Sequence, residues 1–189
     1  MPYVLSDKLP HAVSVCACLG ALIAGGTATA QEASSTGGAA FVPPPPPPKK
    51  ATLRADGKVI APASAPRRVK RVITAANRLI GKPYRYGGGH TPFSRVLDSG
   101  YDCSGSVSYA LYGGRFLRSP LPSGDLMSWG RRNPGRWITV YANSGHAYVV
   151  VAGLRFDTGM RDDPSYTGPA WSKQLRRSDS YVPRHPRGY

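Results

Sequence analysis

Six consecutive prolines at positions 43–48 divide this 189-residue chain into a part that cannot build a core and a part that can. Proline fixes its own backbone and has no N–H to donate, so the run favours an extended polyproline II rod of roughly 19 Å. The surrounding residues 31–66 are rich in Ala, Ser, Gly and Pro and bury too little apolar surface to fold. We therefore expect residues 31–66 to be a disordered linker. A role as a spacer is the simpler interpretation, and recognition by a proline-binding partner is the alternative. The fold is then confined to residues 67–189, a length suited to one domain.

Residues 1–30 have the pattern of a secretory signal peptide. A lysine precedes an apolar stretch over residues 12–24, which is shorter than the roughly 18 residues of a membrane-spanning helix. Residues 28–30, Ala-Thr-Ala, then fit the A-x-A cleavage pattern. We expect cleavage after this triplet, export to the periplasm, cell wall or extracellular space, and no transmembrane segment after processing. A lipoprotein anchor on Cys16 or Cys18, or a segment that stays uncleaved, are the alternatives.

Removal of this segment leaves a single cysteine, Cys103, which can form no intrachain disulfide. Exported proteins usually pair their cysteines, so a lone one suggests a catalytic thiol, with a buried small hydrophobe as the plain alternative. The pattern around it predicts a helix that begins close to Cys103, with Asp102 or Ser104 as a possible cap, and runs to about residue 112, where two glycines end it. Cys103 then lies in the first turn, where free N–H groups and the helix dipole lower the pKa of a thiol.

Downstream, residues 136–141 and 147–152 are rich in Val, Ile, Tyr and Trp and predict two strands joined by a turn. His146 stands at the start of the second strand. If a tight turn follows, a third short strand over residues 154–157 places Asp157 beside this histidine. A helix-borne cysteine facing a strand-borne histidine that a third polar residue holds is the arrangement of cysteine-nucleophile catalysis.

Upstream, apolar residues at helical spacing predict an amphipathic helix over residues 67–80 that packs on the core and ends at Gly81. The three glycines at 87–89 make a loop. No GK[ST] sequence follows them, which argues against a nucleotide site.

The charge and the residue composition of the domain limit which partners and cofactors it is expected to bind. Residues 67–189 contain 20 Lys and Arg, 7 Asp and no Glu. This basic surface suits anionic cell-envelope polymers; the arginines are scattered and no nucleic-acid-binding motif accompanies them, so we expect no nucleic acid. One cysteine and three dispersed histidines offer no zinc spacing, and H-E-x-x-H is impossible without glutamate. We expect no metal and no other cofactor.

Four short motifs together resemble the NlpC family of bacterial cell-wall cysteine endopeptidases. They are LIGKPYRYGG at 79–88, DCSG at 102–105, LPS at 121–123, and a Gly-His pair at 145–146 that leads into a valine-rich strand. The resemblance covers roughly residues 67–157. It implies a papain-like α+β fold, with N-terminal helices and the nucleophile at a helix start packed on an antiparallel sheet. It also implies hydrolysis of the peptide stems of peptidoglycan.

By this resemblance Cys103 is the nucleophile and His146 the general base. Asp157 falls where the family places the residue that orients the imidazole. That residue is often a histidine, so aspartate is a departure, although a carboxylate can also accept the imidazole N–H.

The resemblance further places Tyr84, Asp102 and Ser104 in the substrate-binding cleft, where similar proteins receive the amino end or the small side chains of the stem peptide. Asp102 can equally serve only as a helix cap, and Tyr84 only as a structural tyrosine. His90 and His185 lack such neighbours. We expect His90 to be a loop residue and His185 to be exposed.

Other functions stay open at this point. The same fold can carry an amidase or acyltransferase variant, or a catalytically inert wall-binding module. A basic envelope or nucleic-acid binder with an incidental cysteine is a third class; retention of Cys103 with His146 argues against both non-catalytic classes. Residues 162–189 lie outside the matched part, and their aromatic residues and arginines suggest either a final strand or a basic tail.

Overall fold

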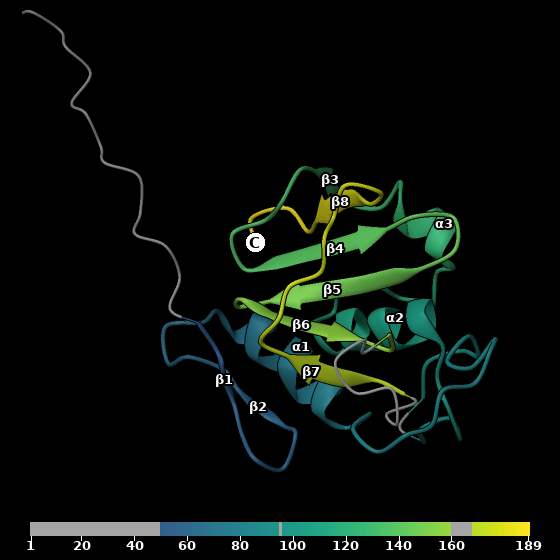
Figure 1. Cartoon of the computed structure of the whole chain (residues 1–189), viewed down its shortest axis with the longest axis horizontal. Helices are drawn as coiled ribbons and strands as arrows, with labels where there is room; N and C mark the ends of the chain where they lie inside the picture. The colour runs from purple at the N-terminus through teal and green to yellow at the C-terminus, as the bar shows by residue number, and fades with distance from the viewer. Residues whose placement is uncertain (1–49, 95, 160–167) are drawn as a thin grey trace, which may run out of the picture. The chain divides into compact units, whose positions relative to one another are not determined.

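The computed structural model describes residues 50–94, 96–159 and 168–189. Within these residues, helices pack against a six-stranded sheet in which every pairing is antiparallel (Figure 1). The helices are α1 (Arg67–Asn77), α2 (Cys103–Gly113) and the short α3 (Ser123–Leu126). The sheet runs in the order β3 (Arg131–Arg132), β8 (Val182–His185), β4 (Ile138–Ala142), β5 (Ala147–Val151), β6 (Leu154–Asp157) and β7 (Ala170–Ser172). The predicted α+β fold, with the cysteine at a helix start and an antiparallel sheet, is confirmed.

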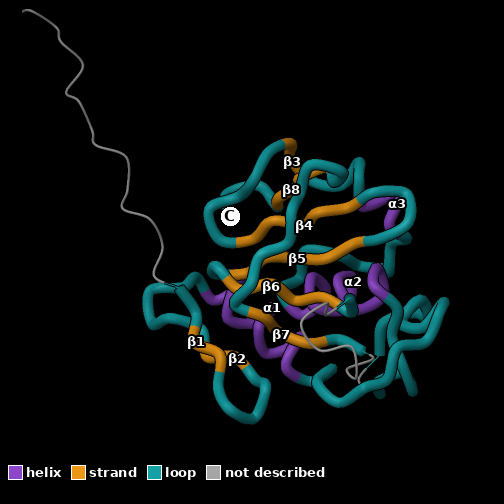
Figure 2. Tube along the Cα trace, in the orientation of Figure 1, coloured by secondary structure: helices purple, strands orange, loops and turns teal. Residues whose placement is uncertain are grey.

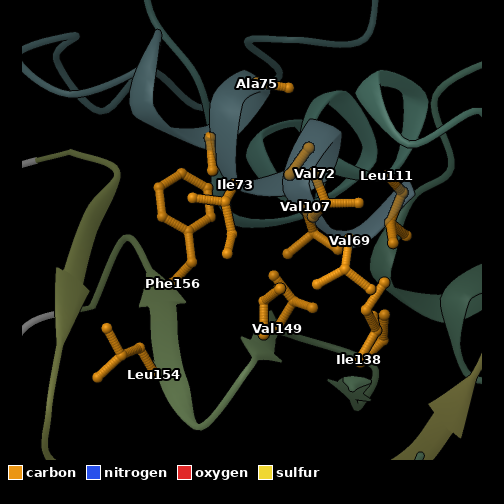
Figure 3. Close-up of a cluster of buried hydrophobic side chains, with 14 of the residues drawn as sticks. Val69, Val72, Ile73, Ala75, Val107, Leu111, Ile138, Val149, Leu154 and Phe156 are labelled. Atoms are coloured by element: carbon orange, nitrogen blue, oxygen red, sulfur yellow. The ribbon is translucent and has the colours of Figure 1, made fainter. Parts of the chain in front are cut away.

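Helix α1 forms where its apolar spacing predicts, although it ends three residues earlier, at Asn77. Its buried residues Val69, Val72 and Ile73 form one face of the helix. They meet Val107 of α2 and strand residues such as Val149, and together these side chains form the core between the helices and the sheet (Figure 3). The core therefore fixes α2, which carries the cysteine, against the middle of the sheet.

Close contact between the two helices depends on Gly113 at the end of α2. A Cβ atom built there would lie 2.3 Å from the Cβ of Ala75 in α1. The two backbones approach too closely for any larger residue at this position. The chain between α1 and α2 runs as loop (Figure 2) and carries the glycines of the first motif.

Residues 50–66 differ from the predicted disorder of residues 31–66. They contain a hairpin of β1 (Thr52–Leu53) and β2 (Val59–Ile60), and Val59 is buried in the core. The Asn77 side chain accepts from the backbone N–H of Val59 at 2.9 Å and donates to its carbonyl at 2.8 Å. Partners distant in sequence thus order a segment whose own composition is poor in apolar residues. The predicted signal peptide and the proline run lie outside the described residues.

The C-terminal segment forms strands, so the basic-tail alternative is wrong. Strand β7 pairs with β6, and β8 pairs with both β3 and β4. Trp171 of β7 packs on Phe156 with 4.9 Å between ring centroids. His185 belongs to β8 and is half-buried, with its Nδ1 2.8 Å from the Asn133 carbonyl oxygen, so the expectation that it is exposed is wrong. In the part of the chain that the structure describes, no helix is long and apolar enough to cross a membrane.

Asn77 links three parts of this fold, because its Oδ1 also accepts from the indole N–H of Trp171 at 3.0 Å. Replacing Asn77 by Ala removes these hydrogen bonds and leaves the Val59 and Trp171 groups without this partner. We expect Asn77→Ala to lower the free energy of unfolding by about 3 kcal/mol, measured by urea denaturation. The matched control is Thr74→Ala on the exposed side of α1, with an expected change within about 0.5 kcal/mol. Equal effects of the two substitutions would contradict the linking role of Asn77.

Candidate active site

Cys103 is the first residue of α2, within the predicted first turn, and is 9% exposed. Asp102 caps the helix: its Oδ1 accepts from the Gly105 backbone N–H at 2.7 Å. The cap satisfies one N–H of the first turn, while the earliest N–H groups of a helix have no partner within it. The thiol therefore lies at the positive end of the helix dipole, where a thiolate is stabilised.

Hydrogen bonds of the backbone and of the Asp102 side chain join the glycine loop to the start of α2. The Asp102 N–H donates to the Gly88 carbonyl at 3.0 Å, and the Gly87 N–H donates to Asp102 Oδ2 at 3.0 Å. A Cβ built on Gly105 would lie 2.1 Å from the Gly88 carbonyl oxygen. The loop can lie this close only because residue 105 has no side chain, so the two motifs form one structural unit that holds Cys103.

The hairpin of β5 and β6 places His146 beside Asp157. A tight turn at Ala152 and Gly153, with φ of 47° and 82°, sets the register in which Val149 faces Phe156. His146 stands immediately before β5, and its Nε2 donates to Asp157 Oδ1 at 2.8 Å. Asp157 is fully buried, so its carboxylate cannot be reached by bulk water. The predicted proximity of these two side chains is found in the structure.

A hydrogen bond joins the His146 side chain to Cys103 and completes a chain of three side chains. Burial alone would raise the pKa of the Cys103 thiol, but the bonds from His146 and from the Ala147 backbone N–H outweigh it and lower that pKa. Burial alone would lower the pKa of His146, but its bonds to Asp157 and Cys103 and their charges raise it from 6.5 to about 9. These opposite shifts favour a thiolate–imidazolium pair near neutral pH.

Arg176, in the segment between β7 and β8, also belongs to this cluster. Its Nη1 donates to Asp157 Oδ2 at 2.9 Å and lies 3.0 Å from His146 Nε2. Sequence reasoning missed it, because Arg176 follows Asp157 by 19 residues with no motif around it. The sequence carries no signal that distinguishes it from the other arginines.

The predicted substrate-binding residues lie beside Cys103. Tyr84 is 43% exposed and forms an isolated bridge with Tyr101; burial and the neighbouring Cys103 charge raise its pKa. Ser104 is buried, and its hydroxyl donates to Asp102 Oδ1 at 3.2 Å. The capping role of Asp102 is thus visible, whereas contact of these three residues with substrate stays a prediction.

His90 lies next to polar side chains of the Cys103 helix, although the sequence showed no sign of such neighbours. It lies in a loop, as expected, but its Nε2 is 3.1 Å from Asp102 Oδ1 and 3.1 Å from Ser104 Oγ. It therefore belongs to the cluster of polar side chains next to Cys103.

Among the described residues, no group of three or more His, Cys, Asp or Glu side chains is arranged to hold a metal ion.

No protein-family model matches the sequence, and no curated protein matches it. Three of the solved structures that resemble the chain come from Mycobacterium tuberculosis. RipB, a peptidoglycan hydrolase, is 29% identical over 66% of this chain and 68% of its own, with a TM-score of 0.45. Rv1477, a hypothetical invasion protein, is 25% identical over 72% and 69%, with a TM-score of 0.46. RipD, a non-catalytic NlpC/p60 domain protein, is 20% identical over 64% and 98%, with a TM-score of 0.47.

The cysteine–histidine bond predicts the pH dependence of Cys103 alkylation. In His146→Ala the bond is lost while burial remains, so the thiol pKa rises and the thiolate fraction at pH 6.5 falls. We expect iodoacetamide to react with the variant at about one tenth of the wild-type rate or less at pH 6.5. The difference between the two rates should be smaller at pH 10. The rate is measured by mass spectrometry of the Cys103 peptide in the full chain. His185→Ala is the control, and a rate unchanged in His146→Ala would contradict the pairing.

Proposed function

We propose that this NlpC-type chain is an exported cysteine peptidase that hydrolyses the peptide stems of bacterial peptidoglycan. The observation that carries the proposal is the bond between Cys103 and His146, with Asp157 on the other side of the imidazole. A buried structural cysteine has no need of a histidine or of a lowered thiol pKa. The same arrangement argues against the catalytically inert module.

Each residue has a distinct step in the proposed reaction. His146 takes the thiol proton, and the Cys103 thiolate attacks the carbonyl carbon of a stem-peptide bond. The imidazolium then gives that proton to the leaving amine, and an acyl-enzyme thioester remains. Water, deprotonated by His146, attacks the thioester and releases the acid and the free thiol. Asp157 keeps the imidazole oriented and stabilises its charge throughout.

The start of α2 supplies the oxyanion site in this scheme. Backbone N–H groups there, including that of Cys103, point out of the first turn because the helix contains no acceptor for them. They are fixed before the reaction, since Asp102 and the Gly88 loop hold the helix start in place. Such preorganised donors stabilise the negative charge that develops on the carbonyl oxygen.

The predicted substrate and surface contacts complete the proposal. Tyr84, Asp102 and Ser104 are near Cys103, with His90 beside them, and in this proposal they bind the stem peptide. Exposed basic residues, such as Arg131 and Arg132 of β3, suit attraction to anionic envelope polymers. This attraction is non-specific and acts at longer range than the cleft.

The direct test is incubation of the full chain with purified peptidoglycan, followed by mass spectrometry of the soluble fragments. We expect fragments cut within the peptide stem from wild type and none from Cys103→Ala, because the acyl-enzyme cannot form. Cys103→Ser is the matched variant of near-equal size, and circular dichroism verifies that each protein is folded. Identical fragments from wild type and Cys103→Ala would sink the peptidase proposal. Binding to the polymer without any cleavage would favour the inert wall-binding module, and cleavage between sugar and peptide would identify an amidase.

The pKa of His146 sets the alkaline limit of this activity. The imidazolium must donate a proton to the leaving amine, so kcat/KM should fall as pH rises through about 9, where His146 loses that proton. In Asp157→Asn the carboxylate charge is gone, the pKa of His146 falls, and this limit moves down by about 1–2 pH units. The readout is the pH profile of kcat/KM on a soluble stem peptide. Asp179→Asn, at an exposed carboxylate, should leave the profile in place, and an unshifted limit in Asp157→Asn would disprove the coupling.

A further inference from the structure

We propose that Arg176 is a positioning residue of the catalytic site, which fixes the Asp157 carboxylate toward His146 and limits how firmly His146 holds its proton. The inference rests on the proposed function for its effect on catalysis. Its structural part concerns only the protein itself and is tested without substrate.

The contacts of Asp157 carry the first half of the inference. Oδ1 accepts from His146 Nε2 at 2.8 Å and from the Gly159 backbone N–H at 2.9 Å, while Oδ2 accepts from Arg176 at 2.9 Å. A carboxylate held by donors on both oxygens cannot rotate about its last bond without breaking one of these hydrogen bonds. Arg176 therefore selects the orientation in which Oδ1 faces the imidazole.

The chemistry of the guanidinium supports the second part of the proposal, the effect of Arg176 on the proton of His146. Arginine only donates hydrogen bonds, and Arg176 Nη1 lies within hydrogen-bond distance of both Asp157 Oδ2 and His146 Nε2. A protonated Nε2 cannot accept from Arg176, so the hydrogen bond from Nε2–H to Asp157 Oδ1 and the hydrogen bond from Arg176 to Nε2 exclude each other. When Nε2–H donates to Asp157, Nδ1 is the unprotonated ring nitrogen and can act as the base. The positive charge 3.0 Å from Nε2 repels an imidazolium, so Arg176 opposes part of the stabilisation that Asp157 provides.

Burial makes these contacts strong. The Arg176 side chain is 19% exposed, Asp157 is 0% exposed, and the guanidinium lies 6.0 Å from the centroid of the Tyr148 ring. Little water is present to screen the charges at such positions. By contrast, the adjacent Arg177 is 94% exposed and pairs with Asp179 at 3.3 Å, away from the cluster.

The charged or titratable groups around His146 come from every neighbouring element. These are Cys103 of α2, Tyr148 of β5, Asp157 and Arg155 of β6, and Arg176 and Tyr181 of the segment before β8. Arg155 Nε lies 3.6 Å from Asp157 Oδ2 and can keep Asp157 ionised when Arg176 is replaced. Removing Arg176 should therefore leave the carboxylate charged, less well oriented, and free to stabilise the imidazolium more fully.

The experiment is an NMR pH titration of the His146 ring in the full chain, assigned by comparison with His146→Ala. In Arg176→Gln we expect the titration midpoint of His146 to move up by about 1 pH unit. Arg176→Lys keeps the charge and should return the midpoint toward that of wild type. Arg177→Gln removes the same charge from the next residue and should leave the midpoint unchanged. A midpoint that stays in place or moves down in Arg176→Gln would overturn the inference.

Kinetics separates the positioning role from the peptidase proposal. On a soluble stem peptide, Arg176→Gln should lower kcat by about tenfold with KM little changed, because orientation of the imidazole matters in the transition state. Recovery of kcat in Arg176→Lys supports positioning, and a pure rise in KM contradicts it. If wild type cleaves nothing while the midpoint shifts as expected, the peptidase proposal fails and the assignment of Arg176 stands. Arg176→Met, similar in size and without charge, repeats the titration if the glutamine variant is unfolded.

Discussion

The hydrogen bond between His146 and Asp157 is the contact on which the site depends, and it forms within one hairpin of the sheet. It joins the first residue before β5 to the last residue of β6. Its length is therefore set by the register of a single hairpin, and a slip of one residue would turn Asp157 to the opposite face. The same sheet packs on α2 through the core, so the hairpin that orients the histidine also faces the helix that carries Cys103.

Local patterns predicted those parts of the molecule in which the relevant partners are close in sequence. The helix over 67–80, the cap at Asp102, and the pairing of His146 with Asp157 each depend on periodicity, on a capping residue or on a turn within a dozen residues. Hydrophobic spacing and turn chemistry act over this range, which is why they indicated the individual helices and strands and placed Asp157 beside His146. The α+β fold as a whole was implied by the resemblance of the motifs.

What the sequence did not indicate depends on contacts between distant segments. Arg176 reaches Asp157 only because β7 pairs with β6, and nothing near position 176 marks one arginine among many. His90 meets Asp102 because the glycine loop lies against the start of α2. The hairpin over residues 52–60 is ordered by Asn77, so its own composition gave the wrong prediction. In each case tertiary packing brings in a partner from a distant part of the chain, and a local sequence pattern carries no information about such a partner.

The position of β8 between β3 and β4 has a consequence for how the protein matures. Residues 182–185 lie inside the sheet, hydrogen-bonded on both sides, although they come late in the chain. The segment that holds Arg176 is anchored by β7 before it and β8 after it, so we expect it to be held in place only when β8 has docked. A chain lacking these residues would keep Cys103, His146 and Asp157 but have an unfinished sheet. The sheet, and with it the segment that holds Arg176, is therefore complete only when β8 has paired on both sides.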